Sequence, residues 1–147
     1  NKMAAFHRPE ETYNLATFPG PSTVKLDASG NGELGQMIVS VSGYGKVPAA
    51  ANAATGLMRG VITDAADNSA GAQGALSVIA RPGVYWFENS AGNACSQATV
   101  GAKVYAESGS KISSNSADGP LAGTLIEFDS SRTDGRYCKV ALLCVKI

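Results

Sequence analysis

The chain has 147 residues, of which 44% are hydrophobic and 16% charged, and its 12 basic and 12 acidic side chains give a formal net charge of zero. This hydrophobic fraction argues against disorder and is enough for one domain with its own core. Without a basic run, nucleic acid is not expected as a partner, because affinity for phosphates depends on clustered lysine and arginine. No run of about twenty apolar residues occurs, so no membrane partner is expected. A surface of low charge repels its neighbours weakly, which suits a protein docked to a larger assembly.

Residues 1–22, NKMAAFHRPEETYNLATFPGPS, differ from the rest of the chain. They combine three prolines with three spaced aromatic residues and show no sustained helical or strand period. Prolines favour extended backbone, and a polar disordered tail would lack the aromatics. We therefore predict an extended N-terminal arm that lays side chains onto another surface, with Phe6, Arg8, Tyr13 and Phe18 as contacts. A strap on its own domain and a cloning remnant are the alternatives.

Residues 23–147 are predicted to form a single β-domain. Short β-prone runs alternate with Gly, Asn, Asp, Ser and Pro, and no window of a dozen residues has a 3.6-residue apolar period. The expected strands lie in TVKLD, LGQMIVSV, LMRGVITDA, ALSVIA, GVYWFEN, AKVYAES, GTLIEFD and RYCKVALLCVKI. YGKVPAAANAATG is expected to be a loop whose alanines could form a turn of helix. Many short strands at this spacing are typical of a small barrel or sandwich.

Two segments of the chain resemble each other, Gly60–Val78 and Gly123–Val140. Each opens with glycine and an aliphatic strand, passes an acidic, serine-rich turn and returns through an apolar strand that ends in valine. Two comparable hairpins in a pseudo-symmetric β-fold are therefore expected, and two copies are too few for a solenoid.

The groups that most enzymes need are scarce in this sequence. His7 is the single histidine and lies in the N-terminal arm, so no Ser-His-Asp or Cys-His arrangement is expected around it. The cysteine spacing does not fit a zinc site, and no Walker or Rossmann glycine pattern occurs. Gly30, Gly32 and Gly35 lie between β-prone runs, where we interpret them as turn glycines. No catalytic residue, metal or cofactor is predicted.

Several carboxylates gather in the two acidic turns. Carboxylates commonly stabilise turns by accepting backbone hydrogen bonds, and this is the role that we predict. Glycoside hydrolysis by a carboxylate pair and calcium binding at DAADN are the alternatives, although DAADN lacks the ligand spacing of an EF-hand. The residues are Asp64, Asp67, Glu127, Asp129 and Asp134.

Three cysteines, Cys95, Cys138 and Cys144, do not make a disulfide framework, because their number is odd. Cys138 and Cys144 lie six residues apart in one predicted strand, about 20 Å at roughly 3.3 Å per residue, so they cannot bond to each other. Cys95 could reach one of them, but buried free thiols are expected. Buried free thiols indicate that the chain folds in a reducing cytoplasm.

The run IARPGVYWFENSAG contains Trp86, the single tryptophan of the chain. In a strand, Tyr85 and Phe87 share one face, whereas Val84, Trp86 and Glu88 share the other. We therefore predict that Tyr85 and Phe87 belong to the core and that Trp86 is packed or lies at a subunit contact. A carbohydrate platform is the alternative for Trp86.

The order of three motifs resembles the family of tailed-bacteriophage capsid cement, or head decoration, proteins. The motifs are RGVITDAADNSAGAQGALSVIARPGVYWFE, ATVGAKVYAESGSKI and GPLAGTLIEFDSSRTDGRYCKVAL, and the resemblance extends from Gly56 to Val145. They share with the family a Gly-Val-x-x-x-Asp turn, a strand with a Gly-Val-Tyr or Gly-Val-Phe step, a Gly-x-x-Val-Tyr strand and a Gly-x-x-x-Glu strand followed by a final Val-x-Leu strand. Residues 1–55 match less clearly.

This resemblance implies an all-β fold, a small β-barrel or β-tulip-like module with the extended N-terminal arm. It implies a structural protein, not an enzyme, that binds the outside of an expanded icosahedral head and clamps neighbouring major capsid proteins. Its partners would be the major capsid protein and further copies of itself in a homotrimer, and it would be made in the bacterial host cytoplasm. The alternatives are a virion-displayed carbohydrate-binding or adhesin module that uses Trp86 and Tyr105, a small β-barrel enzyme acting through the acidic turns, and a tail or baseplate β-module.

Overall fold

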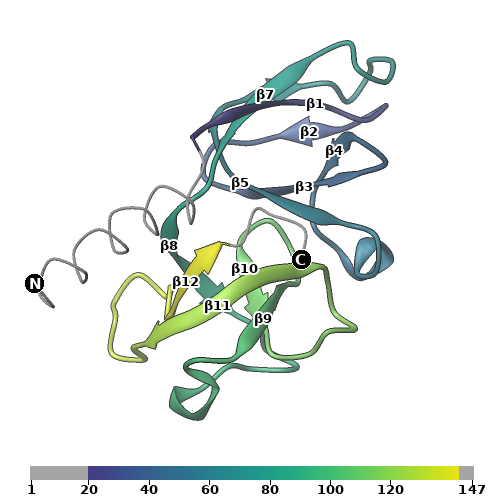
Figure 1. The fold of residues 1–147 in the computed structure, drawn as a ribbon. Helices are drawn as coiled ribbons and strands as arrows, with labels where there is room; N and C mark the ends of the chain where they lie inside the picture. Colours follow the sequence, from purple (N-terminus) through teal and green to yellow (C-terminus); the bar gives the residue numbers. More distant parts are fainter. Residues whose placement is uncertain (1–19, 143–147) are drawn as a thin grey trace, which may run out of the picture.

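The computed structural model describes residues 20–142, and within this range the chain is built almost entirely from β-strands (Figure 1). The predicted all-β fold is therefore confirmed, including a closed barrel. The elements are β1 (Ser22–Lys25), β2 (Asn31–Gly32), β3 (Met37–Val41), β4 (Tyr44–Lys46), the 3₁₀ helix η1 (Ala50–Asn52), β5 (Leu57–Asp64), β6 (Ala66–Asp67), β7 (Ser77–Arg81), β8 (Val84–Asn89), the 3₁₀ helix η2 (Gln97–Thr99), β9 (Lys103–Ala106), β10 (Lys111–Ser113), β11 (Leu121–Phe128) and β12 (Cys138–Leu142).

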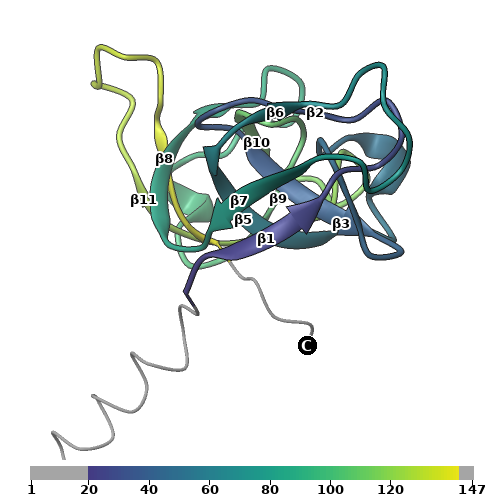
Figure 2. The ribbon, with the colours of Figure 1, turned by 90° about the horizontal axis from the view of Figure 1, so that it is seen from above.

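The first half of the described chain forms a five-stranded sheet in the order β1-β7-β5-β3-β4. The sheet curls so far that its two edge strands, β1 and β4, approach each other. Leu26, just after β1, forms a parallel bridge with Gly45 of β4. The β2–β6 pair lies alongside this sheet (Figure 2). A Cβ on Gly32 would lie 2.5 Å from Cγ1 of Val78, so only a glycine allows β2 to pack this close to β7. The interior of the curled sheet holds Val24, Leu26, Ile38, Ile62, Val78 and Ala80.

The second half of the described chain forms a closed barrel in the order β10-β8-β12-β11-β9. The β8–β10 pair is parallel and the other pairs are antiparallel. Each strand of the barrel has two neighbours, so the barrel exposes no free edge that could pair with another chain. Its interior is apolar and includes Phe87, Val104, Ile112, Leu125, Cys138 and Val140.

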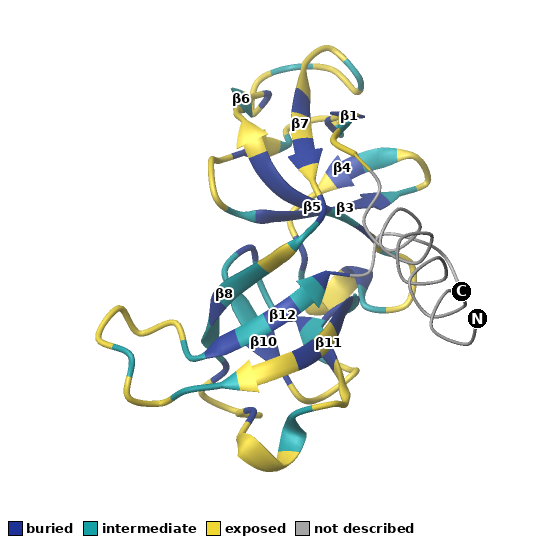
Figure 3. Ribbon diagram, turned by 60° about the vertical axis from the view of Figure 1, so that its left-hand side comes forward, coloured by how far each residue is buried: buried dark blue, intermediate teal, exposed yellow. Residues whose placement is uncertain are grey.

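The core of the barrel is shared with the curled sheet, because β3 and β5 contribute residues to it. Met37 and Val39 of β3, with Met58 and Val61 of β5, belong to the same buried cluster as the barrel residues. Ile38, between Met37 and Val39, points to the opposite side, into the curled sheet. Because side chains alternate along a strand, β3 is buried on both faces and serves as a wall between the two cores. Figure 3 shows the buried segments of β3, β5 and β12, with exposed loops around them.

The strand predictions agree with the structure for the longer strands. The predicted hairpins are confirmed, because β5 pairs antiparallel with β7 and β11 with β12. Both pairs contain a register shift, between Ile62 and Asp64 in one and between Leu125 and Glu127 in the other. The turn of helix predicted among the alanines is η1. The expected loop YGKVPAAANAATG was wrong at its start, since Tyr44–Lys46 form β4 and pair with β3. The interpretation of Gly32 as a turn glycine was wrong, since it lies buried in β2, whereas Gly35 has the positive φ of a turn.

Candidate docking groove

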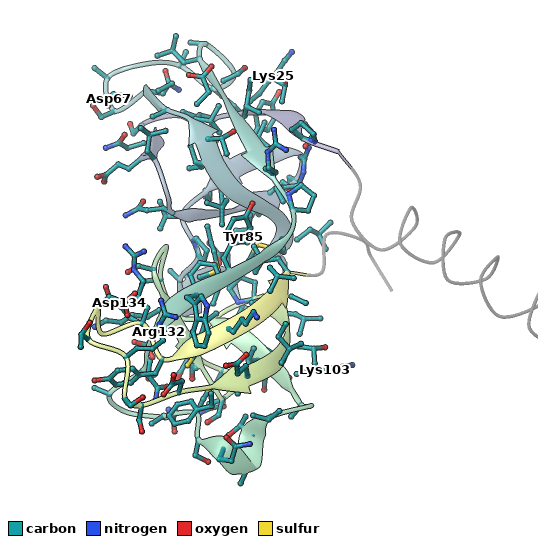
Figure 4. All side chains as sticks on the ribbon, turned by 90° about the vertical axis from the view of Figure 1, so that its left-hand side faces the viewer. Lys25, Asp67, Tyr85, Lys103, Arg132 and Asp134 are labelled. Atoms are coloured by element: carbon teal, nitrogen blue, oxygen red, sulfur yellow. The ribbon has the colours of Figure 1, made fainter. Side chains whose placement is uncertain are left out.

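A groove of about 520 Å³ lies where the curled sheet meets the barrel. Residues 61–63 of β5 line one side and residues 84–88 of β8 line the other, with Gly35 and Ser110 beside them. Arg132 and Arg136, from the loop between β11 and β12, complete the lining. In Figure 4, Tyr85 lies between the two sheets and Arg132 lies beside Asp134 at one side of the molecule.

The alternation of β8 decides which of its side chains belong to the core. Phe87 is buried, and Tyr85 is partly buried and packs against the same core, as predicted. The two rings lie 6.3 Å apart, and the Tyr85 hydroxyl donates a hydrogen bond to the Arg81 carbonyl oxygen at 3.1 Å. The opposite face of β8 carries Val84, which is exposed, and Trp86, which is partly buried.

Trp86 is covered by a cation. The Arg132 guanidinium lies 3.9 Å from the centre of the indole ring, and Nζ of Lys139 lies 5.8 Å from it. A positive charge over an aromatic face is attracted by the negative potential of the ring. The indole face that a sugar would stack on therefore already carries Arg132, and this geometry does not favour the carbohydrate platform. Trp86 is packed, one of its two predicted roles, and its role at a subunit contact stays a prediction.

Asp134 fixes the position of Arg132. Nη2 of Arg132 donates to Oδ2 of Asp134 at 2.7 Å, and Nε donates to Oδ1 at 3.3 Å, so the two planar groups meet side by side. The hydrogen bond from Arg132 lowers the pKa of Asp134, and the backbone N–H of Arg136 lowers it further. The carboxylate is consequently charged at neutral pH and holds the guanidinium over Trp86.

The loop between β11 and β12 is shaped by its own carboxylates and projects beyond the barrel (Figures 2 and 3). Oδ1 of Asp129 accepts hydrogen bonds from the N–H and the hydroxyl of Ser131. Oδ1 of Asp134 accepts one from the N–H of Arg136, and Gly135 supplies a φ of 78° next to it. The turn role predicted for Asp129 and Asp134 is confirmed.

Two charged side chains of the groove have no ion pair within residues 20–142. Arg136 lies close enough to Asp134 to lower the pKa of that carboxyl, but its guanidinium makes no hydrogen bond to the described chain. Glu88, the last of the β8 residues that line the groove, likewise has no ion pair within residues 20–142. The groove therefore combines apolar walls with one available cation and one available anion.

The remaining carboxylates of the acidic turns do not converge on a common point. Asp67 accepts a hydrogen bond from the N–H of Ser69 in the curled sheet, whereas Glu127 forms an ion pair with Lys139 in the barrel. Asp64 lies exposed at the end of β5. No group of three or more His, Cys, Asp or Glu residues in the described part of the chain could hold a metal ion.

Cys95 and Cys138 are buried free thiols, as predicted. They contact each other through a hydrogen bond, and this contact, together with burial, raises the pKa of the Cys138 thiol. The neutral thiol is a weak nucleophile, so Cys138 is a core residue. Cys144 lies outside the described residues, as do His7 and the predicted arm contacts Phe6, Arg8, Tyr13 and Phe18.

The sequence pattern places Trp86 in a strand but does not indicate the loop residues that cover it. The segment SSRTDGR belongs to the acidic, serine-rich turn of the second predicted hairpin, and its two arginines lie more than forty positions after Trp86. The antiparallel pairing of β12 with β8, which sets Lys139 opposite Trp86, creates this proximity. An arginine at the tip of a hairpin next to an aromatic strand is the signal that could have indicated the contact.

Comparisons with protein-family models, with curated proteins and with solved structures found no match to this chain. No helix within residues 20–142 is long and apolar enough to cross a membrane.

Proposed function

We propose that this chain is a structural capsid decoration protein, which binds the outer surface of an expanded bacteriophage head and clamps neighbouring major capsid proteins. The observation that carries the proposal is the placement of the three motifs that resemble the cement-protein family. They form β5 to β12, which include the closed barrel and the strand pair that joins it to the curled sheet. The resemblance implies a compact β-module of this type.

The physical basis of such a function is preferential binding to one state of the capsid. A protein that binds the expanded lattice but not its precursor stabilises the lattice by mass action. Individual contacts can be weak, because a homotrimer that touches several capsomers at once raises the effective concentration of each contact. The zero net charge of the chain suits this role, because an outer capsid protein needs no affinity for DNA.

The N-terminal segment supplies the contact residues of the proposed function. Aromatic side chains between prolines bury a large area and lose little conformational freedom on binding. We assign Phe6, Arg8, Tyr13 and Phe18 to contacts with a neighbouring copy or with the capsid floor, and Trp86, which lines the groove, to a subunit contact.

Co-sedimentation of the purified chain with phage heads tests the proposal. Expanded heads and unexpanded procapsids are prepared from the major capsid protein of the same genome and mixed with increasing amounts of the chain. The chain should saturate expanded heads at a stoichiometry set by the lattice and should leave procapsids undecorated. Equal binding to both particles, or binding to neither, would contradict the proposal.

A variant of the N-terminal segment tests the contact assignment separately. Replacing Phe6, Tyr13 and Phe18 together by alanine should leave the circular dichroism of the β-domain unchanged and should weaken binding to expanded heads at least tenfold. The matched control is Ile126→Ala, which removes an exposed apolar side chain from the barrel surface instead. If the triple variant decorates heads as tightly as the control, the contact assignment is wrong.

A further inference from the structure

We propose that the groove between the curled sheet and the barrel receives residues 1–19 of a second copy of this chain. The inference rests on the proposed function in one respect only, since that function gives the N-terminal segment a contact role. The groove is the surface that receives this segment, and its occupation by a second copy requires no capsid.

The walls of the groove suit a short apolar segment. Tyr85 and Trp86 of β8 are partly buried, and the opposite side is formed by residues 61–63 of β5, of which Val61 and Ile62 are buried and Thr63 is exposed. Val84, at the start of the β8 segment, is 39% exposed. A volume of about 520 Å³ lies within the range of roughly 300–1,000 Å³ that is typical of ligand-binding sites. Aromatic side chains separated by a few residues, as in the N-terminal segment, bury the most area in such a site.

The charges of the groove and of the segment are complementary. Arg136 and Glu88 have no ion pair in the described chain, and both line the groove. The N-terminal segment carries Arg8 followed by Glu10 and Glu11, so it offers one cation and two anions within four residues. Glu10 and Glu11 can pair with Arg136 while Arg8 pairs with Glu88. Pairing of opposite charges across an interface selects the partner and fixes its direction.

The length of the N-terminal segment allows exchange between copies. In Figure 4, β1, drawn in faint purple, begins at the right of the molecule, whereas Arg132 and Asp134 lie at its left. Nineteen residues span at most about 65 Å when extended, and a folded chain of this size has a radius of gyration of about 14 Å. The segment is therefore long enough to leave its own domain and reach an adjacent one. Zero net charge leaves little repulsion between the copies.

Trp86 makes the groove directly observable, because it is the single tryptophan of the chain and lies in the groove wall. The full-length chain is diluted stepwise while tryptophan emission and sedimentation velocity are recorded. The inference expects an oligomer that dissociates on dilution, with a change in Trp86 emission over the same concentration range. An emission that does not depend on concentration, or a chain that is monomeric throughout, would overturn it.

Charge reversal identifies the segment that occupies the groove. Arg136→Glu alone, and Glu10→Arg with Glu11→Arg alone, should each weaken self-association at least tenfold. Combining all three changes in one chain should restore association to within about threefold of the original. Lys103→Glu, an exposed reversal on β9 outside the groove, should have no effect and controls for net charge. Thermal unfolding followed by circular dichroism verifies that each variant is folded.

The outcomes separate this inference from the proposed function. Failure of the combined variant to regain association means that the segment does not occupy the groove, whatever happens on heads. Decoration of expanded heads by the Arg136→Glu variant at the original affinity, with its self-association lost, supports the groove as a contact between copies and not with the capsid.

Discussion

The Arg132 guanidinium lies 3.9 Å above the ring of Trp86 and is held there by Asp134. This contact joins the tip of the β11–β12 hairpin to β8, which precedes it by more than thirty residues. The backbone of the loop is already ordered by hydrogen bonds to Asp129 and Asp134, so the side chain of Arg132 needs little further ordering to cover the indole. The hairpin thereby contributes Arg132 and Arg136 to the lining of the groove.

Arg132→Ala should expose the indole of Trp86. We expect tryptophan emission of the folded protein to move to longer wavelength, because water replaces the guanidinium over the ring, and the urea midpoint to fall slightly. Lys103→Ala, on β9, is the control for the loss of one surface cation and should change neither quantity. Unchanged emission in Arg132→Ala would mean that the guanidinium does not cover the ring in solution.

Leu125→Ala should destabilise the barrel strongly. Leu125 is completely buried in the shared core, and deleting a buried leucine side chain costs about 2–5 kcal/mol because a cavity remains. The neighbouring Ile126 is 43% exposed, so Ile126→Ala should change the free energy of unfolding by no more than about 0.5 kcal/mol. Urea denaturation of both variants measures the difference. Similar losses in both would contradict the assigned register of β11.

Gly60→Ala tests the close approach of β5 to the end of β7. Gly60 has a φ of 127°, and a Cβ there would lie 2.6 Å from the carbonyl carbon and oxygen of Arg81. Neither backbone can move without disturbing the sheet, so we expect a loss on the order of 3 kcal/mol. Gly92 has no atom within 4 Å of such a Cβ, and Gly92→Ala should be nearly neutral. Equal stability of the two variants, measured by thermal unfolding, would show that β5 and β7 lie farther apart.

Much of the fold could be predicted from the sequence because its longer strands carry strong local signals. The apolar runs around Val39, Val61 and Phe87 are bounded by turn residues, and the structure places all three in buried strands. The shortest strands could not be predicted in this way, because β2, β4, β6 and β10 have only two or three residues each. Their formation depends on neighbours that are distant in sequence, because β2 pairs with β6 and packs with Gly32 against Val78.

The candidate site was predictable only in part for the same reason. The alternation along β8 correctly separated Phe87 from Trp86, since a strand period is a local property. The cover over Trp86 depends on a hairpin tip, and the groove depends on how the curled sheet packs against the barrel. Neither arrangement is encoded within a window of a dozen residues, so the local pattern around Arg132 and Arg136 was not enough to assign them to the site.

Asp118→Asn should make the stability of the fold less dependent on pH in the acid range. Oδ2 of Asp118 accepts hydrogen bonds from the Ser113 hydroxyl at 2.6 Å and from Nδ2 of Asn93 at 2.9 Å, and these bonds lower the pKa of the carboxyl. A carboxyl whose pKa is lower in the folded chain than in the unfolded chain stabilises the fold at pH values above its unfolded pKa, which is about 3.9. That stabilisation is lost as the pH falls below this value and through the folded pKa.

The wild-type chain should therefore lose stability between pH 5 and pH 2 more steeply than Asp118→Asn, whose side chain does not titrate. Thermal unfolding at several pH values measures both slopes. Asp64→Asn is the matched control, because the Asp64 carboxylate accepts no hydrogen bond and forms no ion pair in the described chain. This control should retain the wild-type slope. If Asp118→Asn also retains it, the bonds from Ser113 and Asn93 do not hold the carboxylate in solution.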